Sequence, residues 1–315
     1  MTEEKRTVDV VIPVYKPGPE FLKVLEILNK QTLPPGKIVL MITESADSIV
    51  PDFGDRENTE TYFVKEREFD HGGTRNLGLS HCSADYVAFL TQDAVPEGET
   101  FLEKMVSGMK RGEKIAASYA RQLPKEDASV LEKATRSFNY PAESSLRTEA
   151  DIPARGIKTF FLSDVASIYD REIFESLGGF TEQMIFNEDM LYAHKAVTSG
   201  YGIFYNGDAA VYHSHNLRLS EQFHRNFDLG VSQADHPEVF QSVSSEKEGG
   251  SMVKTVTKEL LKTGKWYYLP YFVCQCGFKF IGYKMGKNYK KLSEKTVKKC
   301  SMNKHYWEDR KNGTD

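Results

Sequence analysis

The chain has 315 residues, of which 40% are hydrophobic and 27% are charged. These proportions are typical of a folded globular protein and exclude a disordered chain, a collagen-like chain and a polytopic membrane protein. Lys and Arg number 41 against 45 Asp and Glu, a formal net charge of −4. A nucleic-acid-binding protein is usually clearly basic, so we expect no nucleic-acid partner.

Positive charge is concentrated near the C-terminus. Residues 252–300 hold 12 Lys and two Glu, a net charge of +10, so the remaining residues carry −14. An acidic body with a basic tail indicates a partner for the tail.

Four cysteines are present, and none of them forms a Cys-x-x-Cys pair: Cys82, Cys274, Cys276 and Cys300. A zinc ribbon or a disulfide framework is therefore not expected. The N-terminal segment enters a strand pattern without an apolar leader, so we expect no signal peptide and a cytoplasmic protein.

The first 120 residues alternate between strand-like and helix-like segments. Short apolar runs predict strands over residues 8–15, 37–43, 61–65, 85–91 and 115–120. Apolar residues at helical spacing predict helices over residues 20–31, 73–81 and 97–111. Nearly continuous apolar strands that alternate with helices are typical of a mostly parallel sheet covered by helices.

The second half of the chain begins with a polar stretch, residues 122–157, which we expect to form a helix and a mobile loop. The pattern then predicts a strand over residues 159–169, helices that end at glycines over residues 170–177 and 188–199, and a long strand over residues 202–215. Beyond residue 218 the pattern is helical and basic. We therefore expect an α/β domain over residues 1–220 and a helical basic extension over residues 221–315.

Ligands of an open α/β sheet bind outside the carboxyl ends of its strands. One such end carries Asp93, in Thr91-Gln92-Asp93, which is suited to hold a divalent cation on a diphosphate. The alternative is an aspartate that only forms a turn. No Gly-rich dinucleotide or P-loop motif is present, so those two nucleotide-binding classes lose their main support.

Another predicted strand ends in His213-Ser214-His215, where the strand period of two places both histidines on one face. A histidine pair of this kind can bind a metal, although a single histidine at such a position is usually structural. The spacing does not decide which of the two would be the ligand.

Two further groups of residues lie at predicted helix starts. Arg75 follows two glycines that open a helix, a setting suited to an anionic ligand or simply to a helix start. Glu188 and Asp189 begin a later helix, where they serve either as a general base or as favourable charges at the helix dipole. Adjacent helix residues do not share a face, so at most one of the two is expected to point into a cleft.

The ordered set of motifs resembles glycosyltransferase family 2. The motifs that carry this resemblance are VDVVIPVYK, GGTRNLG, FLTQDAVP, Gly178-Gly179-Phe180 before Asn187-Glu188-Asp189, and Gly200. FDHGGTRN, TQDA and HSHN are most similar to the bacterial rhamnosyltransferases of that family. The resemblance covers about residues 8–220 and implies the GT-A fold.

The resemblance also implies roles for individual residues. Pro13 and Tyr15 would flank the nucleotide of the donor, and Arg75 would hold its base or diphosphate. Gln92 and Glu44 would complete the donor site. Thr91 stands where the family has the first aspartate of its Asp-x-Asp motif, and Glu44 is the acidic residue nearest to the family's aspartate after the second strand.

For the chemistry, the resemblance implies a metal held by Asp93, in the family's Asp-x-Asp position, and by His213. Asp189 would be the catalytic base. The cation would be Mn²⁺ or Mg²⁺, and transfer would invert the anomeric centre. The implied donor is dTDP-β-L-rhamnose or another nucleotide sugar, and the implied acceptor is a lipid-linked oligosaccharide of a cell-surface polysaccharide. The alternatives are a sugar nucleotidyltransferase and a non-catalytic membrane-bound scaffold.

Residues 266–283 form an aromatic, apolar stretch interrupted by Pro270 and Lys279. Eighteen residues fall short of the ~20 that a spanning helix needs. An amphipathic surface element with interfacial aromatics and lysines fits better. We therefore expect peripheral association with the anionic inner face of a bacterial plasma membrane. The alternative is a helical hairpin packed on the core with a solvated basic face.

Overall fold

The structure is a computed structural model that describes residues 6–45, 57–112, 114–240 and 245–308. It divides into two compact units. The first unit comprises Met1–Leu123, Tyr140–Glu182 and Glu188–His213, and the second comprises Pro124–Asn139, Gln183–Asn187 and Ser214–Asp315. The second unit thus includes two segments that precede residue 221, the expected start of the extension.

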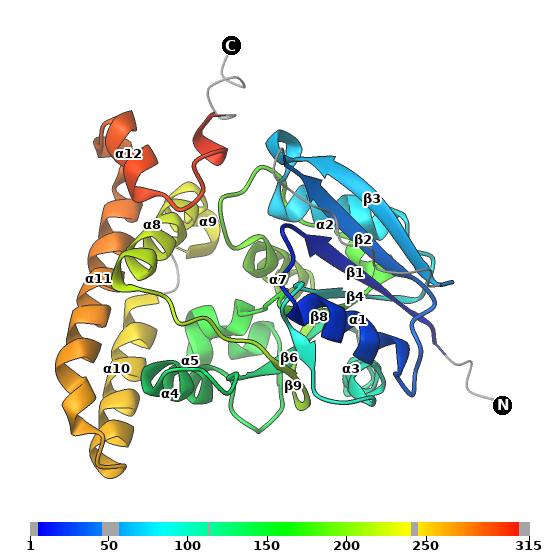
Figure 1. Ribbon diagram of the computed structural model, residues 1–315, viewed down its shortest axis with the longest axis horizontal. Helices are drawn as coiled ribbons and strands as arrows, with labels where there is room; N and C mark the ends of the chain where they lie inside the picture. Colours follow the sequence, from blue (N-terminus) through cyan, green and yellow to red (C-terminus); the bar gives the residue numbers. More distant parts are fainter. Residues whose placement is uncertain (1–5, 46–56, 113, 241–244, 309–315) are drawn as a thin grey trace. The chain divides into compact units, whose positions relative to one another are not determined.

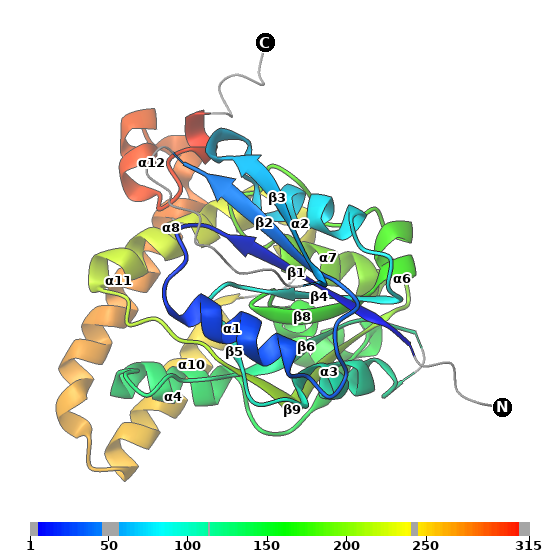
Figure 2. The same cartoon turned by 45° about the vertical axis from the view of Figure 1, so that its right-hand side comes forward.

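The first unit is built on one nine-stranded sheet, drawn in Figures 1 and 2, with the strand order β3-β2-β1-β4-β8-β6-β9-β5 and with β7 paired to β9. The strands are β1 Val8–Val14, β2 Ile38–Glu44, β3 Thr59–Lys65, β4 Tyr86–Leu90, β5 Val95–Pro96, β6 Ile115–Leu123, β7 Ser145–Arg147, β8 Ala166–Asp170 and β9 Gly202–Tyr212.

Strand direction divides this sheet into two regions. Strands β3, β2, β1 and β4 are mutually parallel, as the apolar runs predict. Strand β8 is antiparallel to both β4 and β6, β6 and β9 are parallel, and the short β5 and β7 are antiparallel to β9. The expected mostly parallel sheet is therefore a mixed one. A strand buried on both faces has the same apolar pattern in either direction, so the sequence does not reveal the reversal.

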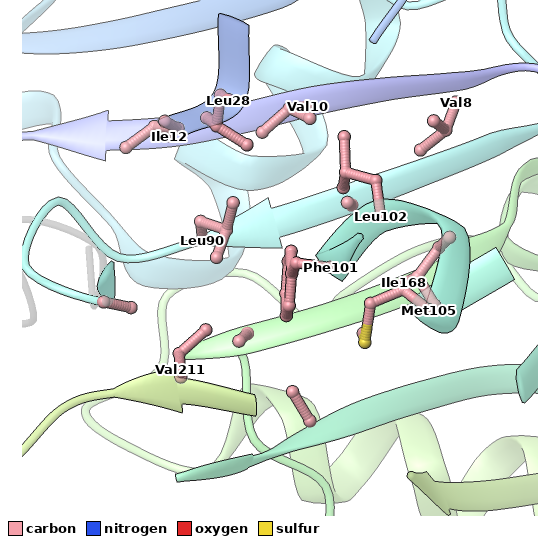
Figure 3. Packing of buried hydrophobic residues seen from close by; sticks show 14 of the residues in the cluster. Val8, Val10, Ile12, Leu28, Leu90, Phe101, Leu102, Met105, Ile168 and Val211 are labelled. Atoms are coloured by element: carbon pink, nitrogen blue, oxygen red, sulfur yellow. The ribbon is translucent and has the colours of Figure 1, made fainter. Parts of the chain in front are cut away.

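Helices cover both faces of the sheet. On one face, α1 (Glu20–Asn29) and α3 (Phe101–Met109) pack on the strand residues that include Val10 and Ile168. Figure 3 shows this packing from close by. The neighbouring residues Val11 and Tyr169 point to the other face, toward α2 (His71–Ser80), α6 (Arg171–Ser176) and α7 (Glu188–Thr198). This sandwich of helices around a sheet confirms the expected α/β class.

Helix boundaries follow local signals. Helix α2 begins at His71, two residues before the predicted start, because the Asp70 side chain accepts a hydrogen bond of 2.6 Å from the Gly73 N–H. Gly178 and Gly179, which follow α6, have φ values of 77° and 66°. These left-handed conformations match the predicted glycine closure of that helix.

The polar stretch 122–157 is more ordered than expected. It contains α4 (Val130–Asn139), β7, a 3₁₀ turn at Glu149–Asp151 and the short helix α5 (Ile152–Arg155). The buried Arg147 donates hydrogen bonds of 2.9 Å to the carbonyl oxygens of Lys158 and Phe161. Contacts of this kind cannot be read from a polar composition.

The second unit is helical. It contains α4, α8 (Leu219–Asp235), α9 (Pro237–Phe240), α10 (Ser245–Lys262), α11 (Leu269–Lys287) and α12 (Glu294–Cys300). Helices α8 and α11 approach closely, since a Cβ atom at Gly230 would meet the carbonyl oxygen of Tyr283 and one at Gly286 would meet that of Phe227. Within the described residues, no helix is both long and apolar enough to cross a membrane.

Candidate active site

The first candidate position is the end of β4, where Asp93 meets His213. His213 directly follows β9, and its backbone N–H donates a hydrogen bond of 2.9 Å to the Leu123 carbonyl, which continues the pairing with β6. The His213 Nε2 atom lies 3.6 Å from Asp93 Oδ2. His215 is two residues further on and belongs to the second unit.

The other nitrogen of His213 fixes the orientation of the ring. His213 Nδ1 lies 3.0 Å from the Gln122 Oε1, and the amide nitrogen of Gln122 donates to Ser163 Oγ at 2.9 Å. Because Gln122 Oε1 can only accept, Nδ1 carries a proton, and Nε2 is the ring nitrogen that faces Asp93. An imidazole held in this tautomer beside a carboxylate is a donor set suited to a divalent cation.

Gln92 and Tyr15 connect two of the strand ends. The Gln92 side chain accepts a hydrogen bond from the Tyr15 N–H at 2.8 Å and donates one to the Tyr15 carbonyl at 2.9 Å. The Tyr15 hydroxyl donates to Glu66 Oε1 at 2.7 Å. Gln92 therefore positions the backbone after β1, a role that the sequence does not indicate.

Pro13 and Glu44 lie at the expected strand ends. Pro13 is the penultimate residue of β1 and is paired with Met41 of β2. Glu44 is the last residue of β2, and its side chain is exposed. Both stand at the carboxyl ends of neighbouring parallel strands, and their proposed contact with the donor stays a prediction.

Arg75 is buried and faces two carboxylates. Its Nη1 lies 3.1 Å from Glu188 Oε1 and 2.9 Å from the His71 carbonyl oxygen, and its Nε lies 3.6 Å from Asp164 Oδ2. Only 5% of the residue is exposed. The structure thus brings Arg75 together with Glu188, a pairing that the sequence analysis missed, and the donor contact expected for Arg75 stays a prediction.

Asp164 is a further polar residue that sequence reasoning missed. It is 3% exposed, and its Oδ1 accepts hydrogen bonds of 2.7 Å from Ser167 and 2.6 Å from the Tyr169 hydroxyl. Burial is the main reason why the pKa of Asp164 lies above its ordinary value. The signal was present in the sequence, because a lone carboxylate at the edge of an apolar strand needs buried partners.

Asp189 lies beside this cluster, at the second position of α7. Its Oδ1 accepts a hydrogen bond of 2.7 Å from the Met190 N–H, and its Oδ2 accepts one of 3.4 Å from the Asp164 N–H. Asn187, just before the helix, has a φ of 68°, which turns the chain sharply into the helix. Glu188 is buried against Arg75, whereas Asp189 is only partly buried. Which of the two carboxylates faces the substrate stays a prediction.

Burial raises the pKa of Asp189 well above its ordinary value, and the negative charges of Glu188 and Asp164 raise it further. The positive charge of Arg75 opposes these effects but is outweighed. A partly buried carboxylate with a raised pKa is suited to accept a proton and to hold it. The arrangement therefore offers a general base on α7 and a cation-binding pair at the ends of β4 and β9.

Comparison with known proteins identifies the family. Residues 9–178 match the model of Glycosyl transferase family 2. The O-antigen chain rhamnosyltransferase RfbN of Salmonella typhimurium is 37% identical to this chain over 302 residues, which cover 95% of this chain and 96% of RfbN. The O-antigen chain rhamnosyltransferase WbaN of Salmonella anatum is 36% identical, with 95% of each chain covered.

A solved structure shows the same fold. The mannosyltransferase PcManGT of Pyrobaculum calidifontis, determined with GDP-Man and Mn²⁺, aligns with a TM-score of 0.53 and 16% identity over 92% of this chain and 77% of PcManGT. The family match and this structural match confirm both the resemblance seen in the sequence motifs and the expected GT-A fold. The chain belongs to glycosyl transferase family 2 and is a glycosyltransferase.

Proposed function

We propose that this enzyme transfers L-rhamnose from dTDP-β-L-rhamnose to a hydroxyl group of a lipid-linked glycan during bacterial cell-surface polysaccharide synthesis. The observation that carries the proposal is the identity of 37% and 36% with two O-antigen chain rhamnosyltransferases across 95% of the chain. A match of that extent includes both the sheet-bearing unit and the helical unit.

Asp189 is proposed as the general base. It would take the proton of the acceptor hydroxyl while that oxygen attacks the anomeric carbon from the face opposite the diphosphate. One displacement inverts the anomeric centre, so the β-linked donor gives an α-L-rhamnoside without a covalent enzyme intermediate. The raised pKa of Asp189 supports this role, because a base must hold the proton once it has been transferred.

Asp93 and His213 are proposed as ligands of Mn²⁺ or Mg²⁺, with His215 as a third candidate because it lies two residues from His213. These residues suit a divalent cation because the contact with Gln122 orients His213 so that its Nε2 faces the Asp93 carboxylate. When bound, the cation supplies positive charge to the leaving diphosphate. PcManGT, which shares the fold, was determined with Mn²⁺.

The donor site is proposed to lie at the carboxyl ends of the parallel strands. Pro13 and Tyr15 would flank the nucleotide, with Glu44 and Arg75 as further contacts. Gln92 would act through the Tyr15 backbone that it holds.

We further propose that the helical unit attaches the enzyme to the inner face of a bacterial plasma membrane. Several large side chains of its C-terminal half are exposed, among them Trp266 at 64%, Tyr267 at 60% and Val273 at 67%. Residues 252–300 also carry the net charge of +10. Exposed aromatics beside lysines are typical of interfacial binding to anionic lipids.

A donor screen tests the rhamnosyltransferase proposal. Purified enzyme is given dTDP-rhamnose, dTDP-glucose, UDP-glucose or GDP-mannose with an acceptor lipid extract, in the presence of Mn²⁺, Mg²⁺ or EDTA. We expect transfer from dTDP-rhamnose only, and nearly abolished transfer by the Asp189→Asn variant. Efficient use of a UDP- or GDP-sugar in place of dTDP-rhamnose would contradict the proposal.

A further inference from the structure

The helical unit contains a cavity of about 430 Å³ among helices α8, α10 and α11. Its walls are almost wholly apolar and include Leu229 of α8, Val253 of α10 and Phe280 of α11. Val253 and Phe280 are also exposed, so the cavity opens to the surface beside them. Both the volume and the apolar lining fall within the usual range of small-molecule sites.

One cationic side chain lines this cavity. Lys279 of α11 makes no hydrogen bond or ion pair with any residue in the described part of the chain, whereas the polar lining residue Tyr283 donates to Gln233 at 2.9 Å. Burial lowers the pKa of Lys279 below its ordinary value, although the charge of Glu132 acts in the opposite direction. An ammonium group among apolar walls is unfavourable until an anion joins it.

Two adjacent glycines form part of the wall of the cavity. Gly249 and Gly250 lie inside α10, where glycine is a poor helix former, and both line the cavity. A Cβ atom at either position would meet no atom within 4 Å, so close packing does not require glycine there. A larger side chain at Gly250 would therefore meet no steric obstacle at the wall of the cavity, which makes this position suitable for a variant that narrows it.

We propose that this cavity binds the hydrocarbon chain of a single-chain lipid phosphate, with the phosphate group at Lys279. Apolar walls of this extent suit a hydrocarbon chain, and one unpartnered ammonium suits one phosphate. Bilayer phospholipids carry two chains, whereas a volume of about 430 Å³ suits a single short chain. This inference rests on the proposed function in one respect, since such a lipid would be the carrier of the acceptor glycan.

Calorimetry on the full chain tests this site with farnesyl phosphate, farnesol and inorganic phosphate as probes. We expect farnesyl phosphate to bind, and Lys279→Met to weaken its binding at least tenfold while leaving the weaker binding of farnesol unchanged. Gly250→Leu fills the cavity and is expected to abolish binding of both. Gly277→Leu is the matched control, because Gly277 lies in α11 outside the cavity and its Cβ would also meet no atom.

Three results would overturn the proposal: no binding of farnesyl phosphate, equal loss of binding in Gly277→Leu and Gly250→Leu, or equal competition by a short-chain phosphatidylglycerol. Thermal midpoints of the three variants exclude misfolding as the cause of a loss. Transfer of rhamnose to a lipid-free glycan acceptor is measured in parallel. If the proposed function is wrong, the wild type does not transfer rhamnose to this acceptor. If only the lipid site is wrong, the wild type transfers rhamnose to it but does not bind farnesyl phosphate.

Discussion

Arg75 faces more negative charge than it can neutralise. Its guanidinium lies 3.1 Å from Glu188 and 3.6 Å from Asp164, and Asp189 lies next to both carboxylates. One buried positive charge among three carboxyl groups leaves an excess of negative charge if all three ionise. The cluster therefore favours keeping a proton, and the pKa of Asp189 is raised as a result.

The Asp189→Asn variant tests the base. The amide keeps the shape of the side chain but cannot accept the acceptor's proton, so we expect the rate of rhamnose transfer to fall ~10²–10⁴-fold. Binding of dTDP, measured by calorimetry, should change little. Glu188→Gln is the control, because glutamine can still accept a hydrogen bond from Arg75. A larger loss in Glu188→Gln than in Asp189→Asn would move the base to Glu188.

The pH profile tests the electrostatics of the cluster. Asp189 must be ionised to act, so transfer should fall as the pH drops through its raised pKa. Asp164→Asn removes a neighbouring negative charge and leaves Arg75 less neutralised, and both changes lower the pKa of Asp189. We therefore expect the acidic limb of the rate profile to move to lower pH. An unmoved limb would show that Asp164 does not act on Asp189.

The cation site is tested by Mn²⁺ binding and by the metal dependence of transfer. A cation that binds only the folded protein raises the thermal midpoint, so Mn²⁺ should stabilise the wild type. We expect Asp93→Ala and His213→Ala to lose that stabilisation, and transfer to stop in EDTA. His215→Ala decides whether this residue is a third ligand. Equal stabilisation of the wild type and Asp93→Ala by Mn²⁺ would refute the assignment.

The sequence predicted the parts of the site that stand at the ends of elements. Asp93, His213 and Asp189 were proposed because a strand end or a helix start places a side chain at the sheet edge, and their roles stay predictions. The roles of Asp164 and Gln122 were missed because they depend on partners far along the chain, such as the Gln122–His213 contact across 91 residues. The same holds for Arg75, whose partner Glu188 is 113 residues away.

At the scale of elements, periodicity predicted the strands and helices but not the direction of the strands. The strand ranges in the first half agree with β1, β2, β3 and β4 to within a few residues. The antiparallel direction of β8 depends on the path of the segment that precedes it. Arg147 holds that segment by hydrogen bonds to the carbonyl oxygens of Lys158 and Phe161. Neither effect leaves a periodic signal in the sequence.

Glycines in the helical unit give a prediction with an internal control. A Cβ atom at Gly286 of α11 would meet the Phe227 carbonyl oxygen, whereas one at Gly277 of the same helix would meet nothing within 4 Å. We expect Gly286→Ala to destabilise the protein by ~1–3 kcal/mol through overpacking against α8. Gly277→Ala should instead stabilise it by up to ~1 kcal/mol, because alanine favours a helix. Thermal unfolding of both variants checks the contrast, and equal effects would contradict the close helix packing.

At the scale of the whole molecule, charge is divided along the chain. Residues 252–300 carry +10 while the remainder carries −14. Several lysines of this region lie on helices that also expose aromatic or aliphatic side chains, such as Phe280 and Ile281 of α11. A surface that combines both features binds anionic bilayers through charge and apolar insertion together.

Vesicle co-sedimentation separates these two contributions. The full chain should bind vesicles that contain phosphatidylglycerol more strongly than neutral ones, and high salt should weaken this binding because it screens the lysines. Each well-placed lysine contributes roughly 1 kcal/mol at an anionic surface, so replacing Lys258, Lys262 and Lys265 together by Gln should reduce binding by about two orders of magnitude or more.

The double variant Trp266→Ser, Tyr267→Ser tests the apolar contribution. It should weaken binding to anionic vesicles and leave the salt dependence of binding intact, because it removes apolar insertion and not charge. The matched control replaces Lys23, Lys104 and Lys110, which lie in the sheet-bearing unit. Equal binding to neutral and anionic vesicles, or an equal loss in the control, would reject an electrostatic attachment through the helical unit.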